Sequence, residues 1–351
     1  MQNSNRAFLL GPLLKGVSRS FYLTLRVLPA GMRDPVGEAY LLARAADTIA
    51  DTALIPPSQR LAQLLTLRER VNGITDDDAG LARLAAEVAG QQTQSDEKLL
   101  LESLGGALEV LAQLDDADRA AVREIVTTLT EGMEFDLRTF PDERSGEIRA
   151  LARWDDLDRY TYLVAGCVGE FWTKMTYMHL PGTLDPALQE TMSRRGVRFG
   201  KALQMVNVLR DCGKDLRIGR CYLPASMLAQ AGLTARDLLE PGASARSRGI
   251  LFELVRIALD HFRAAIDYTF ALPRLSMRLR LACLWPILIG LETLEKLVAN
   301  EAWLDPAKTS KVTRNDVYRI LAGSTLLAPS NALLERWFRR LIARVEARLK
   351  V

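Results

Sequence analysis

Residues 34–51 read DPVGEAYLLARAADTIAD and place acids in a segment that is otherwise largely apolar. An α-helix turns 100° per residue, so four of its polar side chains fall within roughly 60° of one another on one face. They are Tyr40, Arg44, Asp47 and Asp51. Apolar residues cover most of the remaining circumference, as in a helix that packs on several sides. The stretch therefore predicts a largely buried α-helix with one acidic line.

Carboxylates on such a helix need partners, because burial of an unpaired charge is costly. Arg44 alone cannot neutralise both Asp47 and Asp51. Mg²⁺ would do so, since it takes one or two carboxylates together with waters and phosphate oxygens. The alternative is an exposed stripe with an ordinary ion pair within the helix, and a lone D-x-x-x-D fits that interpretation better.

A second stretch, residues 200–215, reads GKALQMVNVLRDCGKD and repeats the pattern. Four polar side chains again lie within roughly 80° on one helix face. They are Gln204, Asn207, Asp211 and Asp215. Four bases lie among or just after them, namely Arg210, Lys214, Arg217 and Arg220. Because a guanidinium can bind two phosphate oxygens at once, two such helices could hold Mg²⁺ and a diphosphate together.

With these two motifs the sequence resembles the squalene and phytoene synthases, which are head-to-head trans-isoprenyl diphosphate synthases, and most closely a bacterial squalene synthase. Four blocks carry the resemblance, in the order of the family and at plausible spacing. They are SRSFYLTLRVLP at 18–29, YLLARAADTIAD at 40–51, YTYLVAGCVGEFW at 160–172 and QMVNVLRDCGKDLRIGRCYLP at 204–224. Each block alone is moderately specific, and the four together are far more so.

The resemblance implies roles for the matching residues. Metal ligands would be Asp47, Asp51, Asp211 and Asp215, with Asn207 as a further polar ligand. Substrate contacts would come from Ser18, Arg19 and Phe21, and the diphosphate site from Tyr40, Arg44, Gln204, Arg210 and Arg220. Tyr160 matches a tyrosine near the reacting carbons and is the candidate for proton removal, with the departing diphosphate as a second candidate base.

The sequence departs from the family pattern at two positions. Leu163 stands where some relatives carry an aromatic or polar residue, and Lys214 stands where relatives often carry an acid. The first aspartate block looks more like squalene synthases, whereas RIGRCYLP is also close to phytoene synthases. The product is therefore left open by the second block.

The reaction implied by the resemblance is a Mg²⁺-dependent condensation of two farnesyl diphosphates to presqualene diphosphate, followed by NADPH-dependent reduction to squalene. Other products in the same family are dehydrosqualene, hydroxysqualene and phytoene. A different class of function is a non-catalytic prenyl-binding scaffold on membranes. A scaffold would need neither aspartate pair, so the presence of both favours an enzyme.

The expected fold is all-α, a single domain over residues 1–351 of the isoprenoid-synthase type, with helices around a central cavity. The 351 residues are 48% hydrophobic, enough for a large core, and apolar residues recur with helical spacing. VAGCVG at 164–169 fits either a close helix crossing or the wall of an apolar slot. Residues 97–114 are expected to form one helix, residues 240–249 a mobile loop, and Ser58 the cap of a helix.

Charge and cysteine content limit the binding partners and the cellular location that we expect for this protein. A net charge of +3 gives no support for nucleic-acid binding, and four cysteines without C-x-x-C spacing indicate reduced, buried thiols. We expect a cytoplasmic monomer without a signal peptide or membrane span. Residues 331–350 predict a basic amphipathic helix, which would lie on a membrane or pack on its own domain. The insolubility of squalene favours peripheral contact with the inner membrane face.

Overall fold

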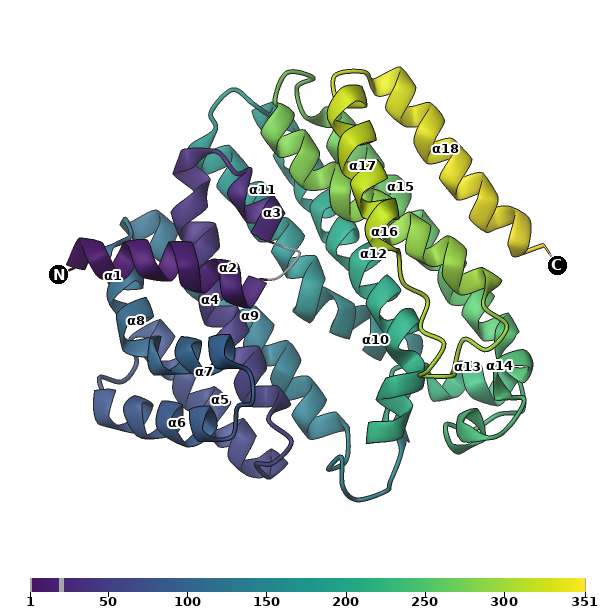
Figure 1. The fold of residues 1–351 in the computed structure, drawn as a ribbon, viewed down its shortest axis with the longest axis horizontal. Helices are drawn as coiled ribbons and strands as arrows, with labels where there is room; N and C mark the ends of the chain where they lie inside the picture. The colour runs from purple at the N-terminus through teal and green to yellow at the C-terminus, as the bar shows by residue number, and fades with distance from the viewer. Residues whose placement is uncertain (1, 19–21, 351) are drawn as a thin grey trace. The chain divides into compact units, whose positions relative to one another are not determined.

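The computed structural model describes residues 2–18 and 22–350, and it divides the chain into two compact units, Met1–Arg138 and Thr139–Val351. Both are helical (Figure 1). The all-α prediction is confirmed, whereas the expectation of one domain stays a prediction.

All the regular elements described in the first unit are helices (Figure 1). In chain order they are α1 Gln2–Phe8, the π-helical turn η1 Leu9–Leu13, α2 Leu14–Ser18, α3 Tyr22–Arg26, α4 Ala30–Asp51, α5 Pro57–Asn72, α6 Asp78–Gly90, α7 Ser95–Glu102, α8 Leu104–Gln113 and α9 Asp116–Thr139, which ends at the boundary. α4 contacts α2, α3, α5, α7 and α8, so its apolar sides are covered within this unit.

The core of the first unit forms around α4. Leu41, Leu42 and Ile49 are fully buried, as the apolar pattern predicts. The end of the helix is fixed by Arg60 of α5, a buried arginine whose guanidinium donates to the carbonyl of Ala50 at 2.8 Å. Such a bond satisfies one of the carbonyls that the last turn of a helix leaves without a partner. The position of the acidic line is thus set by packing and by a cap from the next helix.

The second unit contains the longer helices and one short parallel ladder. Its elements are β1 Arg149–Ala150, α10 Trp154–Thr161, the π-helical turn η3 Tyr162–Gly166, α11 Cys167–His179, η4 Pro186–Leu188, α12 Gln189–Asp215, η5 Leu216–Ile218, β2 Arg220–Cys221, α13 Ala225–Gln230, η6 Arg236–Leu239, α14 Ala243–Arg246, α15 Arg248–Ala271, α16 Met277–Ala299, α17 Arg314–Leu327 and α18 Asn331–Arg348. α12 packs against α11, α15 and α16, which makes it the central helix of this unit (Figure 1).

Small residues let α12 approach α11 and η3 closely. A Cβ added at Gly169 would overlap the backbone of Gly196, and one added at Gly200 would overlap the carbonyl group of Ala165. Only glycine fits where two backbones come this close. The VAGCVG segment therefore forms the close helix crossing that was one of its two interpretations.

A buried arginine joins the ends of three helices in the second unit. Arg280 of α16 is fully buried and donates to the carbonyls of Leu272 and Ala328, each at 2.8 Å. Its second Nη donates to Oδ1 of Asn331, the first residue of α18, at 2.5 Å. Its guanidinium therefore bonds the end of α15, the end of α17 and the start of α18.

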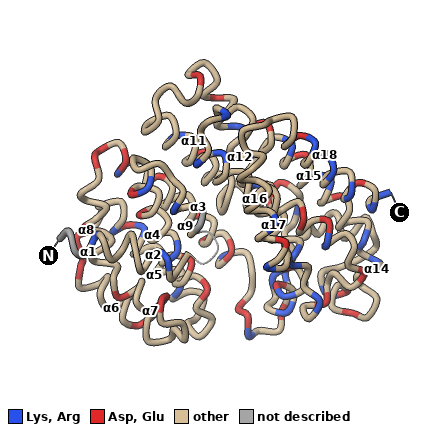
Figure 2. The backbone as a smooth tube through the Cα atoms, turned by 45° about the horizontal axis from the view of Figure 1, so that its top comes forward, with Lys and Arg blue, Asp and Glu red and all other residues tan. Residues whose placement is uncertain are grey.

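The C-terminal helix is where the sequence placed it. Its apolar residues Leu334, Phe338, Leu341 and Val345 are buried, and α18 packs on α16. Arginines recur along its length (Figure 2). No helix within the described residues is both long and apolar enough to cross a bilayer. The packing interpretation accounts for the apolar face of this helix.

Three local predictions were wrong. Residues 240–249 are not a loop throughout, because they contain α14, where Arg246 forms an ion pair with Glu240 at 2.9 Å. Residues 97–114 form two helices that are divided at Ser103. α5 begins at Pro57 without a side-chain cap, because a proline at the first position needs no N–H partner.

Candidate active site

The first unit presents Asp47 and Asp51 on the last turns of α4, one helical turn apart. Arg44 forms an ion pair with Asp47 on its own helix and a second one with Glu97 of α7. Burial disfavours the charged form of Arg44, but these two carboxylates outweigh that cost and raise its pKa. Arg44 is therefore a cation of fixed position beside the aspartates, and Tyr40 lies close enough to favour its charge further.

Glu97 is a site residue that sequence analysis missed. It is 8% exposed and lies 53 positions after Arg44 along the chain. No local pattern could have connected the two, because their contact depends on how α7 packs on α4.

The second unit presents Asp211 and Asp215 at the end of α12. Arg210 holds Asp211 with two donors, of which Nε lies 3.0 Å from Oδ1. One turn earlier, Asn207 donates to Gln204 at 3.2 Å, so these two amides also share a face. Lys214 is exposed beside Asp215. The acidic line predicted for this helix is present, and the arginine Arg210 is paired with one of its aspartates, Asp211.

Arg220 follows α12 after one helical turn and is held in place by a segment that precedes it. Its guanidinium donates to Glu143 at 2.9 Å, and the two side chains are only 14% and 10% exposed. β1 and β2 pair in parallel, with Arg149 opposite Arg220, which fixes this segment against the site. Gly219 adopts a left-handed φ of 85°, where a side chain would be strained. Glu143 is a second residue that sequence analysis did not identify.

Tyr160 is buried at the end of α10, where it stacks on Tyr222. The ring centroids are 4.7 Å apart at 25°, and the Tyr160 hydroxyl donates to that of Tyr222 at 3.3 Å. Phe140 meets Tyr222 edge-on at 5.0 Å. Tyr222 lies in the RIGRCYLP block but was given no role from the sequence.

Two of the predicted substrate contacts, Arg19 and Phe21, lie outside the described residues. Ser18 is the last residue of α2 and is buried, and its hydroxyl donates to the carbonyl of Leu14 at 2.5 Å. In the described structure this hydroxyl therefore serves its own helix.

Each aspartate helix has the donor chemistry that Mg²⁺ requires. Across the described ranges no group of three or more His, Cys, Asp or Glu residues could hold a metal ion by itself. Each helix instead offers two carboxylates, and Mg²⁺ often takes one or two from the protein and the rest from waters and phosphate oxygens. The residues present therefore fit Mg²⁺ that binds together with a diphosphate.

All four cysteines are free and buried, as the sequence predicted. Burial raises the pKa of Cys283 to about 12, so this thiol stays protonated near neutral pH.

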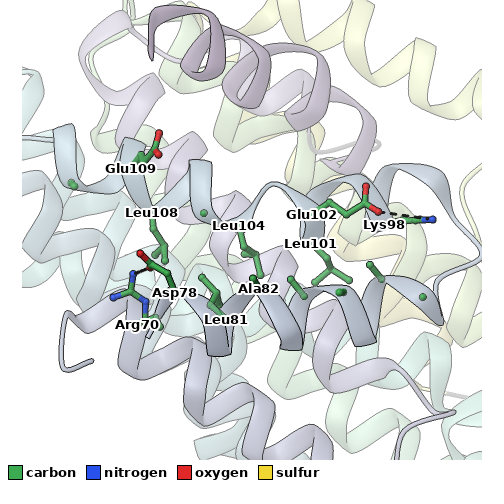
Figure 3. Close-up of a pocket in the computed structure, with 16 residues that line it drawn as sticks. Arg70, Asp78, Leu81, Ala82, Lys98, Leu101, Glu102, Leu104, Leu108 and Glu109 are labelled. Carbon is green, nitrogen blue, oxygen red and sulfur yellow. Dashed lines mark hydrogen bonds and ion pairs between the residues drawn. The ribbon is translucent and has the colours of Figure 1, made fainter. Parts of the chain in front are cut away.

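The first unit also contains an open groove of about 700 Å³ between α6, α7 and α8 (Figure 3). Small and apolar residues such as Leu81, Ala82 and Leu104 line its middle, and charged residues such as Lys98 and Glu102 stand at its edges. None of the predicted site residues lines this groove.

An all-α chain in which each compact unit ends a helix with a D-x-x-x-D pair beside an arginine is typical of enzymes that act on prenyl diphosphates. A family model described as squalene/phytoene synthase matches residues 14–316. The chain belongs to the squalene/phytoene synthase family, which confirms the resemblance inferred from its motifs.

Individual relatives agree with this family but differ in product. A bifunctional lycopene cyclase/phytoene synthase of Pyrenophora tritici-repentis is 26% identical over 92% of this chain, which spans 49% of that protein. A presqualene diphosphate synthase of Rhodopseudomonas palustris is 30% identical over 70% of this chain and 72% of its own length. A solved structure of TcSQS with the ligand E5700 shares the fold, with a TM-score of 0.74, 22% identity and 99% of each chain covered.

Proposed function

We propose that this protein is a Mg²⁺-dependent prenyltransferase that joins two farnesyl diphosphates head to head into presqualene diphosphate, and that it forms squalene when NADPH supplies hydride. One observation supports the proposal most strongly. Each compact unit ends a helix with an aspartate pair one turn apart beside an arginine that an acid holds in place. A chain that needed only to bind a prenyl group would not require this arrangement twice.

The cations of both units suit the binding of diphosphate. Arg44, Arg210 and Arg220 are each held by a carboxylate, which orients the guanidinium before a substrate arrives. Orientation in advance reduces the entropy lost on binding. In this proposal the two sets of residues serve one reaction and bind the diphosphates of the two substrates.

Asp47, Asp51, Asp211 and Asp215 would hold Mg²⁺ with the diphosphates. Bound there, Mg²⁺ would neutralise the negative charge of the leaving diphosphate and so allow the allylic C–O bond to break near neutral pH. The carboxylates themselves fix where that charge is neutralised.

Tyr160 would act at the step that closes the cyclopropane ring. The proton lost from carbon passes by way of the Tyr160 hydroxyl to the departing diphosphate, which is the final acceptor. Tyr160 is only 6% exposed, and exclusion of water protects a carbocation from hydrolysis. NADPH is a second substrate in this scheme, and hydride from it would decide whether squalene forms.

Formation of presqualene diphosphate without reduction is the second candidate. The Rhodopseudomonas relative, described as a presqualene diphosphate synthase, favours it. Purified protein with Mg²⁺ and farnesyl diphosphate should release pyrophosphate in both cases. Extraction and mass analysis of the products, with and without NADPH, separates the two. A protein that stays inert with every allylic diphosphate would exclude both, in favour of a prenyl-binding scaffold.

The aspartates give the sharper test. Asp47→Asn and Asp211→Asn should each lower kcat by at least about 100-fold, because each removes a carboxylate that compensates the diphosphate charge. Far-UV circular dichroism should be unchanged. Asp116→Asn and Asp267→Asn, which alter exposed helical aspartates in the same two units, are matched controls and should keep full activity. Full activity of either site variant would remove that residue from the mechanism.

A further inference from the structure

Tyr222 is buried in the second unit and lies in the RIGRCYLP block, but the sequence assigned it no role. It is 6% exposed, the same value as Tyr160. Its neighbours come from two other parts of the chain, Phe140 from the segment after α9 and Tyr160 from α10. Three aromatic rings from distant positions therefore meet at one point.

The contact between the two tyrosines fixes both ring and hydroxyl. The rings are stacked at 4.7 Å with an angle of 25°, which limits tilting of the Tyr160 ring. The hydroxyl oxygens lie 3.3 Å apart, and the hydroxyl of Tyr222 accepts a hydrogen bond from the hydroxyl of Tyr160. An aromatic ring without such a partner would hold its position less well.

The backbone that carries Tyr222 is itself well supported. Cys221, the preceding residue, pairs with Ala150 in the parallel ladder, and Arg220 is bonded to Glu143. Glu143 and Phe140 belong to the same short segment after α9. One segment thus supports both the arginine assigned to diphosphate binding and the tyrosine that stacks on Tyr160.

We infer that Tyr222 is a positioning residue for the proton transfer assigned to Tyr160, acting through the stacked ring and the hydrogen bond between the two hydroxyls. The inference rests on the proposed function, in which Tyr160 relays the proton that is lost on ring closure. Tyr222 need not touch the substrate. Loss of Tyr222 should slow the proton transfer itself, because misplacement of a catalytic group by about 1 Å can cost about 10²-fold in rate.

Two variants separate the hydroxyl from the ring. Tyr222→Phe keeps the stack and removes the hydrogen bond, and should lower kcat about 10-fold with KM for farnesyl diphosphate within about twofold of wild type. Tyr222→Leu also removes the stack and should lower kcat about 100-fold. If kcat is higher in Tyr222→Phe than in Tyr222→Leu, the ring and the hydroxyl of Tyr222 contribute separately.

A double-mutant cycle then tests whether Tyr222 acts through Tyr160. In the Tyr160→Phe background, Tyr222→Phe should cost nothing further in kcat, because the hydroxyl that it orients is gone. Tyr177→Phe is the matched control, since it removes a tyrosine hydroxyl that bonds the carbonyl of Asp185 at 3.0 Å in the same unit. It should leave kcat unchanged. Thermal unfolding of every variant shows whether a loss of activity reflects a loss of structure.

The outcomes distinguish this inference from the proposed function. An active wild-type enzyme with unchanged kcat in Tyr222→Phe, or with fully additive losses in the double variant, overturns the role of Tyr222 alone. A rise in KM with a matching fall in kcat/KM at unchanged kcat also overturns it, because Tyr222 would then serve binding. A wild-type protein that is inert with Mg²⁺ and every allylic diphosphate overturns both.

Discussion

Stability of the first unit should fall as pH rises, because α4 buries a carboxyl group without a partner. Glu38 is fully buried, and neither of its side-chain oxygens forms a hydrogen bond. Burial raises its pKa from 4.5 to about 8, although the positive charge of Arg6 opposes the shift. In the folded protein Glu38 is therefore a neutral acid at pH 7.

The sign and size follow from proton linkage. The pKa of Glu38 is higher in the folded protein than in the unfolded chain, so between pH 4.5 and 8 the folded state binds more protons. Each pH unit in this range then costs about 1.4 kcal/mol of stability. The full effect of Glu38 is present below pH 4.5, and it is lost as pH rises through 8. The loss reaches about 3 kcal/mol at pH 7 and about 4 kcal/mol at pH 8.

Glu38→Gln removes the titrating group and keeps the shape of the side chain. The free energy of unfolding, from urea titrations followed by far-UV circular dichroism, should decline between pH 5 and pH 8 more steeply in wild type than in this variant, by about 3 kcal/mol over the range. All five tryptophans lie in residues 139–351, so tryptophan fluorescence follows the second unit as a separate probe.

Glu131→Gln provides the control, because Glu131 is an exposed acid on α9 of the same unit. Its unfolding free energy should follow that of wild type at every pH. If wild type and Glu38→Gln instead give parallel curves from pH 5 to pH 8, then Glu38 is already ionised in the folded protein, and the reasoning from burial is wrong.

Two further predictions concern the second unit. Arg280→Met should lower the free energy of unfolding by about 3 kcal/mol, because it leaves buried helix-end carbonyls without donors, and urea titration followed by tryptophan fluorescence measures it. Gly200→Ala should cost about 2 kcal/mol in the same titration, because its Cβ forces α12 away from its neighbour, whereas Gly249→Ala, where the added Cβ meets nothing within 4 Å, should be tolerated. Wild-type stability in Gly200→Ala would show that the close approach is not required.

The sequence predicted the parts of the site that follow one helix. The faces of α4 and α12 emerge from helical periodicity alone, because an α-helix has a fixed rotation per residue. The ion pair between Arg44 and Asp47, three positions apart, was the local alternative to a metal site, and it is present beside the acidic line. Both interpretations can hold, since an arginine and a metal ion can share one carboxylate.

The parts that were missed come from other segments. Glu97, Glu143 and Tyr222 each contact a predicted site residue, but no periodic pattern leads from one to the other. Glu143 lies in an irregular segment, and Tyr222 follows a strand of two residues. Such contacts depend on tertiary packing, so a local reading of one sequence could not assign these partners.

The amphipathic pattern of residues 331–350 shows a different limit of prediction from sequence. A basic helix with one apolar face has the same sequence pattern whether that face meets lipid or protein. In the structure the apolar face is buried against α16. Any membrane contact of α18 would therefore depend mainly on its exposed arginines, such as Arg336 and Arg340, since the only large apolar side chain that the described residues of this helix expose is Leu333.

The two buried glutamates of the first unit show why composition alone could not predict its electrostatics. Glu38 and Glu97 are both buried, yet Glu97 accepts a hydrogen bond from Arg44, whereas Glu38 forms none. Nine residues separate Glu38 from Asp47, which places them on roughly opposite faces of α4. On the face of Asp47, Arg44 is held by Glu97 of α7, whereas on the opposite face Glu38 is buried without a hydrogen bond. The same residue type thus accepts a hydrogen bond in one place and has none in the other, and only the packing around α4 decides which.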